Sequence, residues 1–259
     1  MSVPEVLVHR DAELLAQAVA ARFVTRVVDD QTPRGSASVV LTGGGIGIAV
    51  LAAVAASPAR DAIDWRALHV WWGDERFVPA DHGDRNDRQA YEALLDQVPV
   101  DPLLVHPMPA SDGPDREPEA AAERYAEELN LAARPGDHGG VPRFDVLMLG
   151  LGPDAHVASL FPGLPALYET DRTVVGVRGS PKPPPLRVTL TMPAIRSAAE
   201  VWLIVSGAAK ARAVHLALSE SGVVQVPAAG ARGVNRTLVL LDEAAASALP
   251  PGLRRIASP

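Results

Sequence analysis

Short apolar runs alternate along the chain with longer segments of helical periodicity. The apolar runs are rich in valine, leucine and isoleucine, and they occupy residues 37–42, 67–72, 144–149, 174–177, 186–191, 200–205 and 237–241. Helical patterns fill many of the gaps between them, at residues 11–28, 46–56, 86–96, 117–132 and 207–219. Strands that alternate with helices predict right-handed βαβ units and a mainly parallel sheet.

The strands themselves indicate how this sheet is covered. They are almost continuously apolar, which is typical of a sheet with helices on both faces. Two segments rich in proline, glycine and aspartate flank the 117–132 helix, and we interpret them as surface loops rather than linkers. We therefore predict one α/β domain over residues 1–259.

Charge and composition narrow the choice of partners. The net charge is −7 and the pI is about 5.5, which argues against nucleic acid or an anionic membrane as a partner. An anionic ligand would require basic residues gathered locally. The chain has no cysteine, so thiolate chemistry is excluded. We see no signal peptide, and the longest apolar run is too short to cross a bilayer, so we expect a cytoplasmic protein.

Only two of the 24 basic residues are lysines, Lys182 and Lys210. A GC-rich coding sequence would explain the excess of arginine. Alternatively, these two positions require the compact ammonium group, which differs from guanidinium in geometry and hydration. The sequence alone leaves both explanations open.

Glycine-rich or charged segments follow four of the predicted strands. Ligands of parallel α/β sheets bind beyond the carboxyl ends of the strands, so these segments are expected to converge on one site. The four segments are residues 42–45 (TGGG), 73–79 (GDERFVP), 150–163 (GLGPDAHVASLFPG) and 206–211 (SGAAKA).

The first segment joins a strand to a helix. Free backbone N–H groups and the helix dipole at such a turn suit a phosphate group. The pattern is neither a dinucleotide fingerprint nor a P-loop, because G-x-G-x-x-G and G-K-[ST] are absent. The alternative is a tight turn that needs glycine only for its backbone.

The second segment gathers Asp74, Glu75 and Arg76 beside bulky aromatic residues. Such a desolvated set of carboxylates and guanidinium is a plausible part of a site, although a solvated charge cluster is the alternative. Two further cations need consideration. Arg187 alternates with apolar residues in a strand and needs a partner if both strand faces are covered, and Lys210 lies one turn into a helix, where an ordinary surface lysine is the alternative.

The third segment places Asp154 two residues before His156, after a buried strand. A lone histidine is more often structural than catalytic. This one has a carboxylate within reach to fix its tautomer, which makes it a candidate general base for activating water. We find no serine nucleophile elbow and no dense metal-ligand spacing, so we expect neither a metal nor a cofactor.

Together these segments resemble the 6-phosphogluconolactonase family. The resemblance rests on LTGGG, WWGDERFVP followed by DRNDRQA, FDVLMLGLGPDAHVASLFPG, PKPPPLRVTLT and GAAKA, in order from about residue 37 to residue 211. It implies a Rossmann-like α/β fold shared with the glucosamine-6-phosphate deaminases and binding no nucleotide. It also implies a carboxylic ester hydrolase that opens 6-phosphoglucono-δ-lactone.

The resemblance also implies roles for individual residues. His156 matches the general base, Asp154 its acidic neighbour, and Arg76 a residue of the substrate pocket. The substrate and its phosphate are expected to be held by Thr42, Gly43, Gly44, Gly45, Asp74, Arg187, Lys210 and Lys182. The chain departs from the family at two positions: Ile46 stands where a serine or threonine is frequent, and Ala155 stands where the motif usually has glycine.

Two rival functions are compatible with the same fold. The first is an aldose–ketose isomerase or deaminase of sugar phosphates. A glucosamine-6-phosphate deaminase has a glutamate five residues beyond its loop histidine and a tyrosine after its D-E pair. This chain has Phe161 and Arg76 there, which favours the lactonase. A non-catalytic sugar-phosphate sensor is the other rival, and the sequence shows no DNA-binding segment that would support it. We expect a small-molecule substrate and a monomer or small homo-oligomer.

Overall fold

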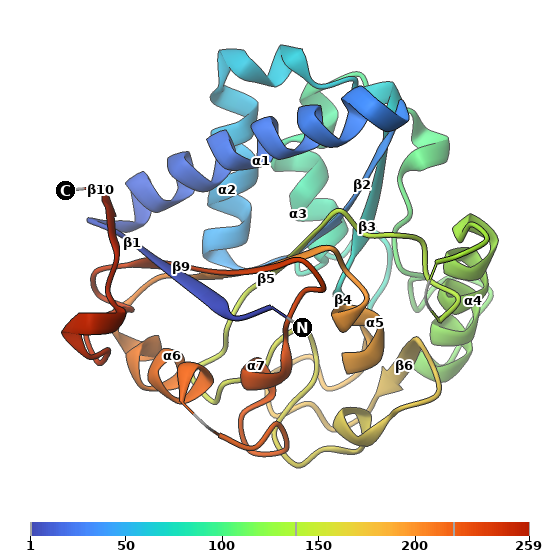
Figure 1. The fold of residues 1–259 in the computed structure, drawn as a ribbon. Helices are drawn as coiled ribbons and strands as arrows, with labels where there is room; N and C mark the ends of the chain where they lie inside the picture. Colours follow the sequence, from blue (N-terminus) through green and yellow to red (C-terminus); the bar gives the residue numbers. More distant parts are fainter. Residues whose placement is uncertain (1, 138, 220, 259) are drawn as a thin grey trace.

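Seven parallel strands form the central sheet of the computed structural model, which describes residues 2–137, 139–219 and 221–258 (Figure 1). The strand order is β10-β1-β9-β8-β5-β2-β3, and every neighbouring pair is parallel. The strands are β1 (Pro4–His9), β2 (Ala37–Leu41), β3 (Leu68–Trp72), β5 (Val146–Leu149), β8 (Glu200–Val205), β9 (Arg236–Asp242) and β10 (Ile256–Ser258).

Helices cover both faces of this sheet, as the apolar strands predicted. On one face lie α1 (Ala12–Arg34), α2 (Gly45–Ala56) and α3 (Asn86–Ala93), and on the other α5 (Met192–Arg196), α6 (Ala211–Leu218) and α7 (Pro227–Gly230) (Figure 1). Side chains alternate between two hydrophobic cores, because successive residues of a strand point to opposite faces. In β5, for example, Val146 and Met148 join the core under α1 and α2, whereas Leu147 and Leu149 join the opposite one.

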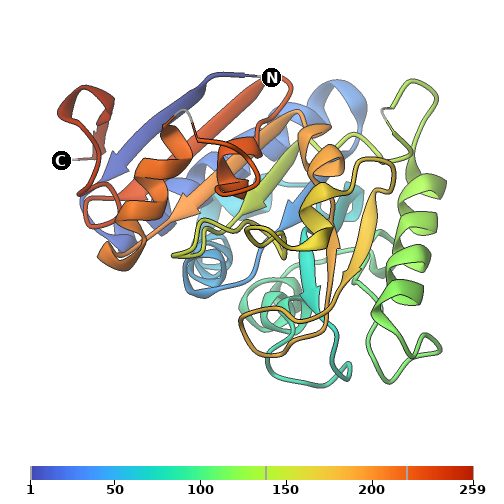
Figure 2. The same ribbon diagram turned by 90° about the horizontal axis from the view of Figure 1, so that it is seen from below.

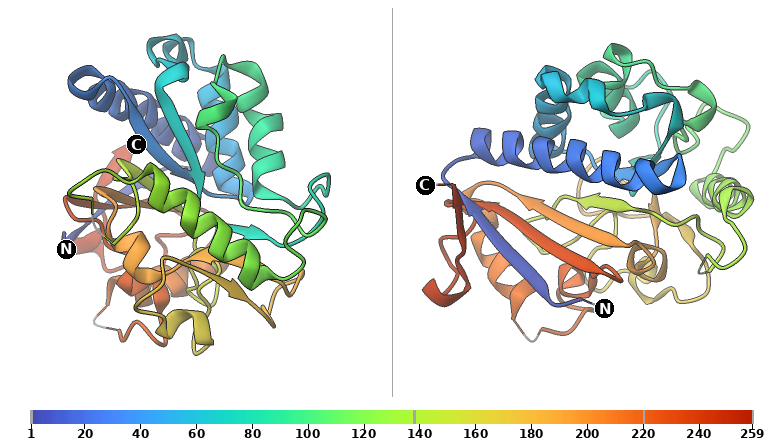
Figure 3. Two further views of the ribbon diagram at one scale, coloured as in Figure 1. Left: turned by 90° about the vertical axis from the view of Figure 1, so that its right-hand side faces the viewer. Right: turned by 45° about the horizontal axis from the view of Figure 1, so that its top comes forward.

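A second sheet of three antiparallel strands stands beside the first. It has the order β4 (Asp74–Arg76), β7 (Arg187–Leu190), β6 (Val174–Val177), and α4 (Pro118–Ala132) packs against it (Figure 3, left). Figure 2 shows α4 at the opposite end of the molecule from the C-terminal strand. The second sheet and one face of the first contribute side chains to the same core.

The sequence predicted seven of these strands and their approximate bounds, but not this second sheet. The runs 174–177 and 186–191 were expected in the parallel sheet, and residues 74–76 in a loop; the structure pairs all three segments antiparallel. The chain leaves the main sheet at Gly73, whose carbonyl accepts a hydrogen bond from Leu190 N–H. Strands β1 and β10 were also missed. Strand β10 is a three-residue edge strand, and β1, which lies between β10 and β9, has an apolar run of only residues 6–8.

Two helices end or begin differently from the prediction. Helix α1 continues six residues beyond Val28 and ends at Gly35, which adopts a left-handed φ of 73° and donates its N–H to Gln31 O. The predicted 207–219 helix is a short 3₁₀ turn, Ala208–Lys210, followed by α6. No helix in the described ranges is long and apolar enough to cross a membrane.

The order in which successive strands are added to the main sheet reverses between β2 and β5. These strands are neighbours, but β2 leads outward to β3 and β5 leads the other way to β8. Such a switch point opens a crevice at the carboxyl ends of the strands. Thr42 Oγ1 bridges the crevice by accepting a hydrogen bond from Gly150 N–H at 3.2 Å. The first and third polar segments of the sequence therefore meet here.

Candidate active site

A cavity of about 200 Å³ lies at this switch point. Ten of the eleven predicted site residues line it, and the eleventh, Asp154, contacts the cavity through His156. The ten are Thr42, Gly43, Gly44, Gly45, Asp74, Arg76, His156, Lys182, Arg187 and Lys210. Segments that are up to 168 residues apart in the sequence, from Thr42 to Lys210, thus converge as predicted.

Asp154 and His156 form a hydrogen-bonded pair at the rim of the cavity. The distance between Asp154 Oδ1 and His156 Nδ1 is 2.5 Å. Burial raises the pKa of Asp154, but the hydrogen bond and charge of His156 and the charge of Lys182 outweigh burial and lower this pKa to about 2. Asp154 is therefore a carboxylate at neutral pH, which favours a proton on Nδ1 and leaves Nε2 able to accept one.

The loop that carries this pair has an unusual backbone. Ala155 adopts a left-handed φ of 66°, the conformation for which glycine is best suited. Ala155 therefore occupies a backbone conformation that the usual glycine of the motif would adopt without strain. Gly152 is required for space, because a Cβ there would overlap the His156 ring. Phe161 supports the same ring from the side, with ring centroids 4.5 Å apart.

Two arginines face each other across the second sheet. Arg76 of β4 and Arg187 of β7 are direct antiparallel partners, and both line the cavity. Burial lowers the pKa of Arg187, and the charge of Arg76 lowers it further. Like charges directly opposite one another destabilise a sheet, so an anion bound between them would relieve the repulsion.

Both lysines of the chain border the same cavity, as the second explanation of their scarcity predicts. Burial lowers the pKa of Lys210, and the nearby charge of Lys182 adds to this effect. Arg187 also holds the loop that carries Lys182: its Nε donates to Pro184 O at 2.9 Å, and its Nη2 donates to Lys182 O at 3.0 Å. The sequence did not reveal this second role of Arg187.

Asp242, at the end of β9, fixes the turn that precedes Lys210. Its carboxylate accepts hydrogen bonds from Ser206 Oγ at 2.8 Å and from Gly207 N–H at 3.0 Å. Gly207 has a φ of 97°, which a residue with a side chain rarely adopts. Sequence analysis missed Asp242, because only the fold brings β9 beside this turn.

The side chains of the three charged residues of β4 point to different faces, because successive residues of a strand alternate. Asp74 and Arg76 line the cavity, whereas the Glu75 side chain is only 1% exposed and points away from it. Asp74 Oδ2 accepts a hydrogen bond from Ser159 Oγ at 2.7 Å. Asn86, another lining residue, contacts Arg76 directly. It belongs to the DRNDRQA motif, but its role was not predicted.

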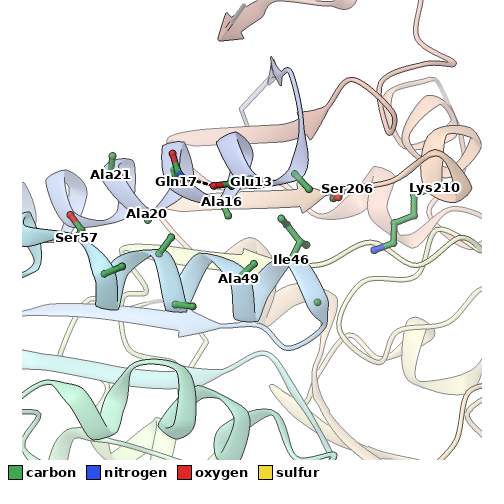
Figure 4. Close-up of a pocket in the computed structure, with 15 residues that line it drawn as sticks. Glu13, Ala16, Gln17, Ala20, Ala21, Ile46, Ala49, Ser57, Ser206 and Lys210 are labelled. Carbon is green, nitrogen blue, oxygen red and sulfur yellow. Dashed lines mark hydrogen bonds between the residues drawn. The ribbon is translucent and has the colours of Figure 1, made fainter.

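A larger hollow of about 900 Å³ lies outside this site, between α1 and α2 (Figure 4). Most of its lining residues are alanines, and it meets the cavity at Gly45, Ile46 and Lys210. Lys210 is its only cationic lining residue in the described chain, and no histidine borders it there. The smaller cavity therefore combines the proton acceptor with the cations, and we assign the site to it.

The residues that line the cavity can supply a general base and an anion site. Among the described residues, no group of three or more histidine, aspartate or glutamate side chains could hold a metal ion. The His156–Asp154 pair can activate water. The four cations Arg76, Lys182, Arg187 and Lys210 can bind a phosphate and stabilise a developing oxyanion.

Known proteins are similar to the chain over nearly its whole length. Residues 10–240 match the family model described as glucosamine-6-phosphate isomerases/6-phosphogluconolactonase. A 6-phosphogluconolactonase of Streptomyces coelicolor is 62% identical over 251 residues, which are 96% of this chain and 96% of that protein.

Solved structures agree with the sequence comparison. A 6-phosphogluconolactonase from Trypanosoma brucei is 33% identical with a TM-score of 0.81, over 95% of this chain and 99% of that one. A monomeric glucosamine-6-phosphate deaminase has a TM-score of 0.75 at 20% identity, over 94% of this chain and 99% of that one, which shows a shared fold. The Rossmann-like α/β fold and the family resemblance are therefore confirmed.

Proposed function

Because the chain belongs to the glucosamine-6-phosphate isomerase/6-phosphogluconolactonase family, we propose that its cavity hydrolyses 6-phospho-D-glucono-1,5-lactone to 6-phosphogluconate, a step of the oxidative pentose phosphate pathway. The observation that carries this proposal is the His156–Asp154 pair in a cavity with four cations. A δ-lactone is an activated ester, so its hydrolysis needs a general base but neither a metal nor a covalent nucleophile. Besides water, the lactone is the only partner that the reaction requires.

His156 begins the reaction by taking a proton from water. As Nε2 accepts this proton, the water oxygen forms a bond to C1 of the lactone, and the carbonyl oxygen becomes an oxyanion. Arg76, together with backbone N–H groups, stabilises the oxyanion. General-base assistance of this kind typically accelerates a reaction by about 10²–10⁴-fold.

Collapse of the oxyanion breaks the bond between C1 and the ring oxygen. The protonated His156 then donates its proton to the departing ring oxygen, which becomes a hydroxyl group. The new carboxylic acid loses its proton to solvent at neutral pH. Asp154 remains a carboxylate throughout and stabilises the transient imidazolium ion.

The phosphate group anchors the substrate at the other end of the cavity. Lys210, Lys182, Arg187 and the backbone N–H groups of residues 43–45 supply charge and hydrogen bonds for it. Ile46 has no hydroxyl, so Thr42 and the backbone take over this part of the contact. Remote binding of the phosphate holds C1 over His156 and lowers the entropic cost of the reaction.

The residues of the cavity favour the lactonase over the deaminase. Phe161, five residues beyond His156, packs on the histidine ring and carries no group that could transfer a proton. Arg76 suits a reaction in which negative charge develops on a carbonyl oxygen. The His156–Asp154 pair also favours an enzyme over a sugar-phosphate sensor, since binding alone does not require a general base.

Purified protein should hydrolyse 6-phosphogluconolactone and release no ammonia from glucosamine 6-phosphate. His156→Ala should lower kcat by about 10²–10⁴-fold and leave the Kd for 6-phosphogluconate nearly unchanged, because the phosphate contacts remain. The assay must subtract the spontaneous hydrolysis of the lactone. Ammonia release at a comparable rate, or wild-type kcat in the variant, would reject the proposal.

We also propose that the enzyme acts in the cytoplasm. A sugar phosphate carries close to two negative charges at neutral pH and does not cross a bilayer unaided. The lactone must therefore be hydrolysed in the compartment in which it is formed.

A further inference from the structure

Arg76 projects into the cavity with little to hold it there. Its Nη1 contacts Asn86 Oδ1, and its Nε has no hydrogen-bond partner among the described residues. The Asn86 amide is itself fixed, because Nδ2 donates a hydrogen bond to Asp74 O at 2.7 Å. Asn86 is only 3% exposed, so this amide has a single well-defined orientation.

The buried Glu75 carboxylate fixes the backbone at both ends of this contact. Its Oε1 accepts hydrogen bonds from Arg76 N–H and Asn86 N–H, each at 2.8 Å. Its Oε2 accepts one from Asp87 N–H at 2.9 Å. One carboxylate thus joins β4 to the first turn of α3. Without this carboxylate, the three N–H groups, one buried and two partly buried, would lose these hydrogen-bond partners.

We propose that Glu75 and Asn86 are positioning residues for the lactonase: Glu75 fixes the start of α3 against β4, and Asn86 thereby aims the Arg76 guanidinium at the carbonyl oxygen of the substrate. This inference rests on the proposed role of Arg76. Neither residue needs to touch the substrate for the effect, because a displacement of about 1 Å at the reacting centre is worth about 10²-fold in rate.

Gly43 supports the same assignment from the other side of the cavity. A Cβ at this position would overlap Asn86 Oδ1 and lie 3.2 Å from Arg76 Nη1. The first glycine of the loop after β2 therefore leaves room for the contact between Asn86 and Arg76. Sequence analysis explained this glycine by phosphate binding or by a tight turn, and it did not anticipate this contact.

Charged and titratable groups face Glu75 from each element packed against it. Arg85 and Asp87 lie at the start of α3, Arg187 on β7, and Tyr125 on α4. Burial raises the pKa of Glu75 to about 7, although Arg85 and the backbone hydrogen bonds oppose the shift. A proton on Glu75 would occupy an oxygen that must accept N–H groups, so acid should weaken the positioning of Arg76.

A double-mutant cycle tests the proposal. Asn86→Ala should lower kcat on the phosphorylated lactone by about 10–100-fold with a smaller change in KM. The reason is that the misplaced Arg76 guanidinium lies near C1 of the lactone and not near its phosphate. In an Arg76→Ala background the same change should have little further effect. Asn235→Ala, at an exposed position, serves as the matched control and should retain wild-type kinetics. Equal losses of kcat in both backgrounds would overturn the proposal.

The pH dependence gives a second readout that a purely structural role would not produce. Wild type and Asn86→Ala share His156, so the ratio of their kcat/KM values isolates the contribution of Asn86. The ratio of wild-type kcat/KM to Asn86→Ala kcat/KM should fall as the pH decreases through about 7, where Glu75 gains its proton. A ratio that stays constant between pH 6 and pH 8, the interval around that pKa, would contradict the role of Glu75.

Glu75→Gln addresses the carboxylate directly. At pH 8, Glu75→Gln should show the same loss of kcat as Asn86→Ala. The ratio of its kcat/KM to that of Asn86→Ala should not change with pH. If Glu75→Gln does not fold, the double-mutant cycle of Asn86 and Arg76 still tests the positioning of Arg76, and the pH dependence of the ratio of wild type to Asn86→Ala still tests Glu75. Failure of the proposed function would appear differently, as a wild-type protein without lactonase activity or an Arg76→Ala variant with unchanged kcat.

Discussion

At the scale of single residues, Ala155 shows how the catalytic loop tolerates a departure from its family motif. A left-handed conformation costs an L-residue roughly 1–2 kcal/mol relative to glycine. Ala155, however, is buried, with only 2% of the residue exposed. Burial of one methyl group contributes about 0.8 kcal/mol, so packing offsets much of the strain.

We therefore predict that two substitutions at this position differ in their effect on stability. Ala155→Gly should change the free energy of unfolding by less than about 1 kcal/mol, because relief of strain is balanced by lost burial and by the greater backbone entropy of glycine. Ala155→Val should destabilise by about 2 kcal/mol or more, because a β-branched residue fits neither this φ nor the space.

Urea unfolding and lactonase kinetics check both variants. Ala155→Gly should keep the Asp154–His156 contact and the wild-type kcat, whereas Ala155→Val should lose kcat together with stability. A valine variant as stable and active as the glycine variant would show that the left-handed backbone is not required.

At this scale, sequence analysis placed residues correctly where their position at the end of a strand decides their location. Thr42, Arg76, His156 and Lys210 each follow a predicted strand, and parallel topology brings such ends together. It could not find Asn86 or Asp242, since neither stands in a pattern that indicates its partner. Their roles depend on hydrogen bonds to residues 10 and 35 positions away.

At the scale of elements, the turn between β8 and α6 carries Lys210, and Asp242 fixes the shape of this turn. Lys210→Ala should raise KM for the phosphorylated lactone by about 10–100-fold, because a charged hydrogen bond contributes roughly 1.5–3 kcal/mol. Asp242→Asn should raise KM in the same direction by a smaller factor, because one acceptor oxygen remains for Ser206 and Gly207.

The unphosphorylated δ-lactone provides the control for this prediction, since its KM should change much less in both variants. The double variant should be little worse than Lys210→Ala alone, because Asp242 acts through the turn that carries the lysine. An equal rise in KM for both lactones would mean that neither residue contributes to binding of the phosphate.

The second sheet is the element that sequence reasoning placed incorrectly. Periodicity identified 174–177 and 186–191 as strands but does not specify their partners. Strand β4 has only three residues, all charged, and no apolar pattern marks it. The antiparallel pairing that opposes Arg76 and Arg187 was therefore beyond the reach of the sequence, although both residues had been assigned to the site.

At the scale of the whole molecule, the main sheet is shared by both hydrophobic cores. Tryptophans lie in both cores, with Trp71 in one and Trp65, Trp72 and Trp202 in the other, so their fluorescence reports on the two cores together. We propose that the chain is a single folding unit. Thermal unfolding should then give one transition, with the same midpoint by tryptophan fluorescence and by far-UV circular dichroism. Two transitions, or midpoints that differ between the probes, would instead indicate two domains.

The confinement of both lysines to one cavity has a chemical consequence. Apart from the α-amino group, every primary amine in the sequence lies where the substrate phosphate is expected to bind. Burial lowers the pKa of Lys210, so a larger fraction of this amine is uncharged and nucleophilic at neutral pH. Apart from the α-amino group, amine-directed acylating reagents would therefore modify this protein only at the cavity proposed as its active site. Acetylation of the same lysines in the cell would inhibit the lactonase, because it would remove charge where the substrate phosphate is expected to bind.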